Sequence, residues 1–149
     1  MVTTLQATLV PPDYARRATI REMEEIEIFS AIGEEGFARL VAAFYRQIPS
    51  DDLLGPLYPA DDLAGAEKRL RDFLMFRFGG PATYLEERGH PRLRMRHAPF
   101  AIGGAQRDRW VQLMNRALEE AALPAQARDV LRQFFESTAT FLINRAAGL

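Results

Sequence analysis

Residues 90–100 read His90-Pro91-Arg92-Leu93-Arg94-Met95-Arg96-His97-Ala98-Pro99-Phe100. Pro91 suits the first turn of a helix, whereas Pro99 cannot continue one and pushes Ala98 out of the helical region. The two prolines therefore delimit a helix of about two turns, at roughly 3.6 residues per turn. On that helix Leu93 and His97 are i, i+4 neighbours, so the imidazole shares a face with an apolar side chain.

The arginines of this stretch flank the same face. Arg92 and Arg96 form a second i, i+4 pair on the expected helix. One imidazole beside apolar surface, edged by guanidinium groups, suits a flat apolar ligand that carries a metal and carboxylates. Haem is such a ligand, because its porphyrin fills four metal positions and the protein need supply only one. The alternative is structural: the helix dipole alone favours a histidine near a helix C-terminus, and the arginines could form a solvated face.

Length and composition indicate one soluble domain. The chain has 149 residues, 48% of them hydrophobic, and a net charge of −1, which offers no general attraction to nucleic acid or to an anionic membrane. Arginines cluster between Arg88 and Arg109, but without the aromatic interleaving of a single-strand binder, so we predict neither nucleic acid nor a membrane as a partner. The absence of cysteine excludes disulfides, thiolate nucleophiles, iron–sulfur clusters and cysteine-based zinc sites.

The first ten residues do not resemble a signal peptide. They lack a basic patch followed by an apolar run. No window of the sequence reaches about 18 apolar residues, the length that a membrane-spanning helix requires. We therefore expect a cytoplasmic protein.

Apolar spacing along the chain predicts an all-α fold. Thr19 and Glu22 fit a capping box, so a short helix should follow and end or bend at Gly33. Asp61 or Asp62 is a suitable N-cap for a later helix. No segment alternates with a period of two. Helical stripes are expected over 37–48, 63–78, 110–121 and, after Pro124, 127–142, with a short helical or looped piece over 82–89.

Further runs of sequence accompany the central stretch. They are Tyr58-Pro59-Ala60-Asp61-Asp62-Leu63-Ala64-Gly65-Ala66-Glu67, Phe78-Gly79-Gly80-Pro81, Arg88-Gly89-His90 and Trp110. Together with residues 91–97 these runs resemble the group II truncated haemoglobins, from about Phe29 to the C-terminus. The resemblance implies a globin-like, truncated 2-on-2 helical sandwich around a haem pocket. Residues 1–28 would then form an N-terminal extension with a short helix, and residues 29–149 the truncated globin domain.

The resemblance also implies the residues that hold the cofactor, haem b. In that family the histidine matching His97 binds the haem iron, whereas His90 has no such role. Arg69 and Arg96 are the candidates to meet the haem propionates, because arginine offers a charged fork for a carboxylate. Three further residues would contact the haem itself: Phe73, Leu74 and Tyr84.

The distal side, where a small ligand binds, is implied to carry Tyr45, Tyr58 and Trp110. Each has a hydrogen-bond donor that a buried site must satisfy, and a small ligand that gains partial negative charge accepts such bonds. Ala66 would leave an opening near the ligand, and Leu70 would help to keep water out. Without the resemblance, all of these residues could simply belong to the core or pack as part of a loop.

The implied function is reversible binding of O₂ and other diatomic ligands such as CO and NO. Strong distal hydrogen bonding predicts slow oxygen release, which favours redox chemistry over transport, such as conversion of NO and O₂ to nitrate or peroxide-driven oxidation. A reductase and a homodimer are candidate partners. Two alternatives are a haem-based gas or redox sensor that acts through the N-terminal extension, and an all-α interaction module without haem.

Overall fold

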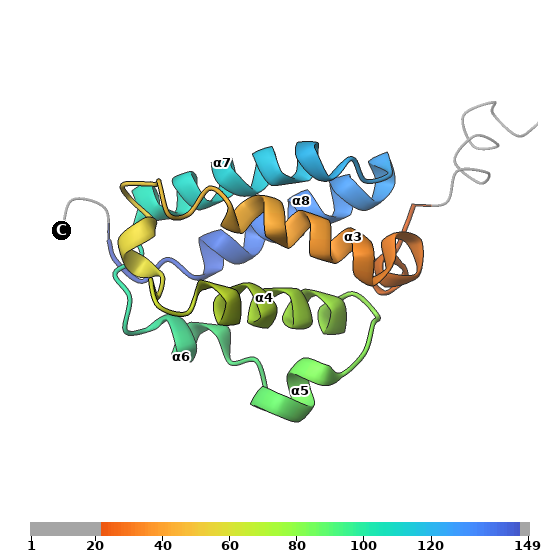
Figure 1. The fold of residues 1–149 in the computed structure, drawn as a ribbon, viewed down its shortest axis with the longest axis horizontal. Helices are drawn as coiled ribbons and strands as arrows, with labels where there is room; N and C mark the ends of the chain where they lie inside the picture. The colour runs from red at the N-terminus through yellow and green to blue at the C-terminus, as the bar shows by residue number, and fades with distance from the viewer. Residues whose placement is uncertain (1–21, 147–149) are drawn as a thin grey trace, which may run out of the picture.

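Two pairs of long helices form the body of the protein. The computed structural model describes residues 22–146, and in this part of the chain all regular structure is helical, as predicted. Helix α3 contacts α4, α7 contacts α8, and α3 also packs on α7, which joins the two pairs (Figure 1). None of the helices within residues 22–146 combines the length and the apolar character of a membrane span. The elements are η1 (Glu25–Glu27), α3 (Ile28–Tyr45), η2 (Gly55–Leu57), α4 (Leu63–Arg77), α5 (Thr83–Arg88), α6 (Leu93–His97), α7 (Gly104–Ala121) and α8 (Ala125–Phe141).

The long helices begin and bend where local chemistry favours it. Asp62 is the N-cap of α4, and its carboxylate accepts the Gly65 N–H at 3.1 Å. Pro124 is the N-cap of α8. Gly33 kinks α3 with φ 66° and ψ 179°, a conformation that is easy only for glycine. These expectations are confirmed: the backbone at Gly33 is not helical, and it separates the two predicted helical segments that together make up α3. The capping box at Thr19 and most of the proposed extension lie outside the described residues.

Helix α6 is shorter than the sequence predicts. It begins at Leu93 rather than at Pro91, because Arg92 is left-handed, with φ 41°, and serves as the N-cap. The loop before the helix is held instead by Arg96, whose Nε donates to the Pro91 carbonyl at 2.8 Å. Arg92 therefore lies outside the helix, and the predicted pairing of Arg92 with Arg96 on one helical flank is wrong.

The end of α6 also differs from the prediction. Ala98 keeps helical angles, φ −56° and ψ −37°, although the following Pro99 disfavours them. Two turn hydrogen bonds offset this preference: the Ala98 N–H donates to the Met95 carbonyl at 3.3 Å, and the Phe100 N–H donates to the His97 carbonyl at 3.0 Å. The prediction that Ala98 leaves the helical region is wrong, but α6 does end before Pro99.

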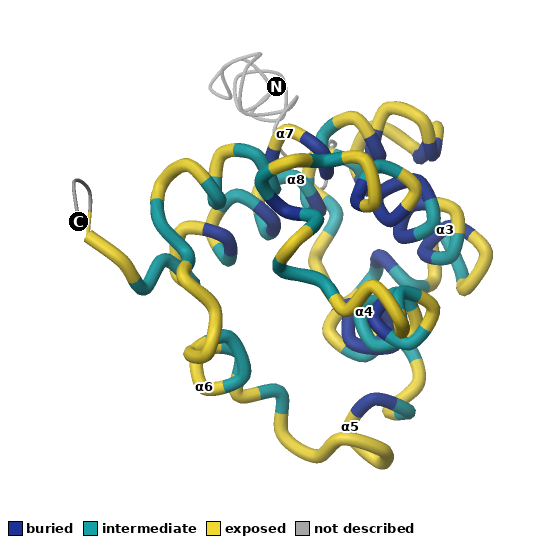
Figure 2. Tube along the Cα trace, turned by 60° about the vertical axis from the view of Figure 1, so that its left-hand side comes forward, coloured by how far each residue is buried: buried dark blue, intermediate teal, exposed yellow. Residues whose placement is uncertain are grey.

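Burial is uneven over the fold. Buried residues gather where α3, α4, α7 and α8 face one another, whereas α5, α6 and the segment between them are mostly exposed or half-buried (Figure 2). Phe37 and Phe78 are fully buried, and their rings stack at 6.2 Å between centroids. The four long helices therefore supply most of the core, and α6 carries His97 at its margin.

Candidate functional site

One cavity gathers the residues singled out in the sequence. Its volume is about 330 Å³, within the range of roughly 300–1,000 Å³ that is common for ligand sites. Side chains from α3, α4, α5, α6, α7 and α8 line it, together with the loop between α3 and α4. All of the predicted site residues are among them: Tyr45, Tyr58, Ala66, Arg69, Leu70, Phe73, Leu74, Tyr84, Arg96, His97 and Trp110.

His97 offers this cavity one ring nitrogen with a free lone pair. Its Nδ1 lies 2.7 Å from the carbonyl oxygen of Leu93, one turn earlier in α6. Because a carbonyl can only accept, Nδ1 carries the proton and Nε2 is left as an acceptor or metal ligand. A neutral imidazole held in one tautomer is suited to bind a metal. His90, by contrast, is exposed and does not line the cavity.

Tyr45, Tyr58 and Trp110 form a cluster of donors at the cavity. The Trp110 Nε1–H donates to the Tyr58 hydroxyl at 3.2 Å, and the two tyrosine rings meet edge-on at 5.6 Å. The fully buried Phe44 packs against all three rings, with centroids 5.2–6.4 Å away. The cluster is therefore both part of the aromatic core and part of the cavity wall.

Burial keeps both tyrosines protonated. It raises the pKa of Tyr58 to about 12, against a smaller lowering by the Trp110 hydrogen bond. Burial, and then the neighbouring Tyr58, raise the pKa of Tyr45 further. Among the described residues, neither tyrosine hydroxyl donates its proton to a protein partner. Two O–H groups are thus available to donate to a molecule in the cavity.

The charged groups at the cavity are all positive in the part of the chain that the structure describes. Arg69 pairs with the N-cap Asp62 at 3.3 Å. Arg96 donates from Nε to Pro91 and from Nη2 to the Arg88 carbonyl at 2.7 Å, so part of its guanidinium is committed to the loop. Contacts of Arg69 and Arg96 with propionates stay predictions. No carboxylate competes for the lining arginines from within the cavity wall, and these are Arg69, Arg88, Arg96 and Arg107.

Sequence reasoning missed most of the wall that α8 and the loop before α7 supply. Apolar spacing placed Phe134 and Leu142 on a buried face, but spacing does not say whether that face meets another helix or a ligand. Thr138, a polar residue within the same stripe, was the signal that could have found this wall. The missed lining residues here are Phe100, Ile102, Phe134, Phe135, Thr138, Ala139 and Leu142.

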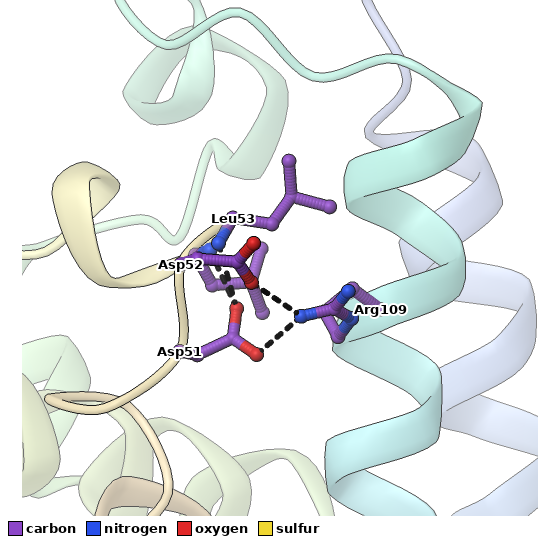
Figure 3. Close-up of polar contacts among 5 residues, drawn as sticks. Asp51, Asp52, Leu53 and Arg109 are labelled. Carbon is purple, nitrogen blue, oxygen red and sulfur yellow. Dashed lines mark hydrogen bonds and ion pairs between the residues drawn. The ribbon is translucent and has the colours of Figure 1, made fainter.

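An ion pair that the sequence did not reveal fixes the loop between α3 and α4. One oxygen of the Asp51 carboxylate accepts the N–H groups of Leu53 at 3.2 Å and Leu54 at 2.7 Å. Its other oxygen lies 2.6 Å from Nη1 of Arg109 on α7 (Figure 3). The exposed Asp52 lies 3.0 Å from the same nitrogen. Burial alone would raise the pKa of Asp51, but the Leu54 bond and the guanidinium outweigh it and hold the pKa below its ordinary value.

This ion pair predicts an acid-sensitive share of stability. Because the native pKa of Asp51 lies below the unfolded value of about 3.9, its contribution is complete above that value and is lost as the pH falls through the native pKa. We expect the wild type to be more stable than Asp51→Asn at neutral pH, with the gap closing below about pH 4. Urea unfolding of both proteins from neutral pH to below about pH 4 measures this difference in stability. A difference that stays constant with pH would contradict the lowered pKa of Asp51.

The chemistry of the cavity suits a flat, iron-carrying ring with carboxylate groups. An imidazole nitrogen such as the free one of His97 is a common protein ligand for haem iron. Leucine and phenylalanine side chains supply apolar walls, and the positive charge of the lining arginines matches propionates. A two-pair helical sandwich around such a cavity defines a globin.

The comparison with protein families gives the particular kind of globin. The model of the family described as bacterial-like globin matches residues 27–144. The chain belongs to this family, and within it to the group II truncated haemoglobins. The predicted family, the 2-on-2 globin fold and the haem cofactor are therefore confirmed, and this protein binds small gas ligands through haem.

Individual relatives agree with this assignment. The group 2 truncated hemoglobin YjbI of Bacillus subtilis is 38% identical over 117 residues, which cover 78% of this chain and 88% of that protein. The crystal structure of a hemoglobin from the thermophilic phototrophic bacterium Chloroflexus aurantiacus is 49% identical in sequence, with a TM-score of 0.77. The match covers 79% of this chain and 98% of the Chloroflexus aurantiacus chain. The structure of a truncated oxygen-avid haemoglobin from Bacillus subtilis is 38% identical in sequence, with a TM-score of 0.75. The match covers 78% of this chain and 98% of the Bacillus subtilis chain.

Proposed function

We propose that His97 ligates haem iron and that the hydroxyl cluster retains a diatomic ligand for redox chemistry. Haem, when bound, supplies the iron at which O₂, CO or NO binds. The Nε2 atom of His97 is free for ligation because Leu93 engages Nδ1. The haem would lie against Phe73, Leu74 and Tyr84, all buried, and these with Leu70 would exclude water from the ligand. The small side chain of Ala66 leaves space near the cluster.

The observation that carries this proposal is the bond from Trp110 to Tyr58. Because the Tyr58 oxygen is already occupied as an acceptor, its own proton remains to be donated. The Tyr45 hydroxyl, which has no protein partner among residues 22–146, supplies a second donor. A ligand that gains negative charge on binding accepts a hydrogen bond from each hydroxyl, and such charge-assisted bonds are about twice as strong as neutral ones.

Tight retention favours chemistry on the bound ligand over its delivery. Oxygen transport requires fast release, which two hydroxyl donors oppose. The Bacillus subtilis relative is described as oxygen-avid, which supports slow release here. A suitable reaction joins NO and O₂ with one electron to give nitrate, so a reductase must supply that electron, and peroxide-driven oxidation is the second candidate.

Removing the donors is expected to speed oxygen release. Tyr45→Phe removes one ligand donor, and Trp110→Phe releases the Tyr58 hydroxyl that the indole N–H holds. Each should raise the O₂ dissociation rate about tenfold, since a hydrogen bond to a charged group contributes about 1.5–3 kcal/mol and 1.4 kcal/mol is a factor of ten. Stopped-flow displacement of O₂ by excess CO measures the rate. CO dissociation serves as the internal control, because CO gains little charge and should leave at a nearly unchanged rate. Unchanged O₂ rates in both variants would remove the basis for the proposal.

The redox role has its own test. Oxygen-loaded wild type mixed with NO should yield one nitrate for each NO consumed, with the protein left oxidised by one electron. Ion chromatography measures nitrate and absorbance follows the oxidation. Release of unreacted O₂ with no nitrate would favour reversible ligand storage instead.

A further inference from the structure

Two consecutive residues of α7 hold the loop between α3 and α4 in different ways. Arg109 reaches back to Asp51, with Nη1 at 2.6 Å from the carboxylate (Figure 3). Trp110 donates to the Tyr58 hydroxyl at 3.2 Å. Helix α7 therefore holds the start of this loop through an ion pair at Asp51 and its end through a hydrogen bond to Tyr58.

The loop between these two anchors is internally bonded. Asp51 accepts three backbone N–H groups of the loop. Its carboxylate accepts those of Leu53 at 3.2 Å and Leu54 at 2.7 Å, and its carbonyl accepts that of Gly55 at 2.9 Å. Leu54 is the N-cap of η2, and the Tyr58 N–H donates to the Gly55 carbonyl at 3.2 Å. A short, bonded segment with η2 at its centre thus connects the Asp51 carboxylate to the Tyr58 ring. A shift of Asp51 would move Tyr58 rather than be absorbed between them.

From these linked contacts we propose that Arg109 and Asp51 are positioning residues for the distal cluster of Tyr45, Tyr58 and Trp110. They hold the Tyr58 hydroxyl within hydrogen-bond distance of the Trp110 indole, and this position sets the oxygen dissociation rate. The inference rests on the function proposed above. Neither Arg109 nor Asp51 lines the cavity, so both act through other residues.

The geometry explains why the pair must be intact. The Asp51 side chain is only 8% exposed, whereas that of Asp52 is 91% exposed. Without Arg109, the Asp51 carboxylate would keep its two hydrogen bonds from loop N–H groups but would be a largely covered charge with no cation, which costs more than the loss of a surface pair. The loop would relieve that cost by moving toward water and carrying Tyr58 with it. Asp52 can hydrate freely, so its contact with Arg109 should contribute little.

The test compares haem-loaded, full-length variants. Arg109→Gln should raise the O₂ dissociation rate about tenfold, as expected for the loss of about one ligand hydrogen bond. Asp51→Asn should act in the same direction, and Asp52→Asn should have little effect. The matched control is Arg46→Gln, because Arg46 also pairs with α7, through Glu120, but both side chains are exposed. An Arg109→Gln rate equal to wild type, or equal effects of Arg109→Gln and Arg46→Gln, overturns the proposal.

Vibrational spectra separate positioning from general loosening. In Arg109→Gln the iron–carbonyl stretching frequency should shift, because it senses distal donors, while the iron–histidine stretching frequency should stay at the wild-type value. Shifts at both bonds would mean a general loss of structure and overturn the proposal. If Arg109→Gln fails to retain haem, Arg109→Lys serves as the second variant, because it keeps the positive charge but lacks the planar guanidinium. Arg109→Lys should give a smaller rise in the O₂ dissociation rate. Failure of Arg109→Lys to fold also overturns the proposal.

Comparison with Trp110→Phe shows which proposal fails. If Trp110→Phe speeds O₂ release and Arg109→Gln does not, only the positioning role of Arg109 is wrong. If neither variant changes the rate, the distal cluster does not hold the ligand, and both proposals fall.

Discussion

Replacing His97 by alanine is expected to abolish stable haem binding. His97 is the only histidine at the cavity, and its Nε2 is the nitrogen left free by the bond to Leu93. Loss of an outer-shell partner alone typically costs about 10–100-fold in metal affinity, so loss of the ligand itself should exceed that. Titration of the apoprotein with hemin, followed by Soret absorbance, measures the change.

Two controls make this result specific to the iron–nitrogen bond. His90→Ala should bind hemin like the wild type, because His90 is exposed and lies outside the cavity. Added imidazole should partly restore the Soret band of His97→Ala, since the deleted side chain leaves space for it. Wild-type affinity in His97→Ala, or equal losses in the two variants, would show that His97 is not the axial ligand.

Replacing Phe44 by alanine is expected to give a large loss of stability. The Phe44 ring is fully buried and contacts the rings of Tyr45, Tyr58 and Trp110. Truncating such a ring costs about 3–5 kcal/mol, because apolar burial is lost and a cavity remains. Urea unfolding of the apoprotein, followed by far-ultraviolet circular dichroism, measures the change without a contribution from haem.

The matched control for Phe44 is another phenylalanine of a long helix. Phe141, at the end of α8, is 56% exposed and has Arg94 above its ring at 5.2 Å. Phe141→Ala should cost no more than about 1 kcal/mol, the range of an exposed cation–π contact. Equal losses in the two variants would mean that Phe44 does not organise the core beneath the cluster.

The sequence determined the helical class and part of the cavity lining, but not the wall that α8 and the loop before α7 supply. Apolar spacing marked the long helices, because a period near 3.6 is visible without knowing what each helix faces. Caps and breaks at Asp62, Gly33 and Pro124 were predictable since they depend on neighbours in the chain. The family motif then marked His97 and the distal donors. A homodimer, a reductase and a cytoplasmic location stay predictions.

Local rules failed where distant groups outweigh them. Around α6 the chain follows Arg96 and two turn hydrogen bonds rather than the preferences of Pro91 and Pro99. Those preferences amount to modest free energies, and side chains that satisfy loop carbonyls can override them.

Only the tertiary structure decided which polar groups meet. Nothing in the spacing of Asp51 and Arg109 indicates that they pair, because an ion pair across 58 positions depends on how α3 packs on α7. The same packing brings Tyr58 to Trp110 and so fixes which hydroxyl protons remain free. Periodicity encodes the face that each helix buries, whereas the partner of a polar side chain is set by contacts that form only when the whole chain has folded.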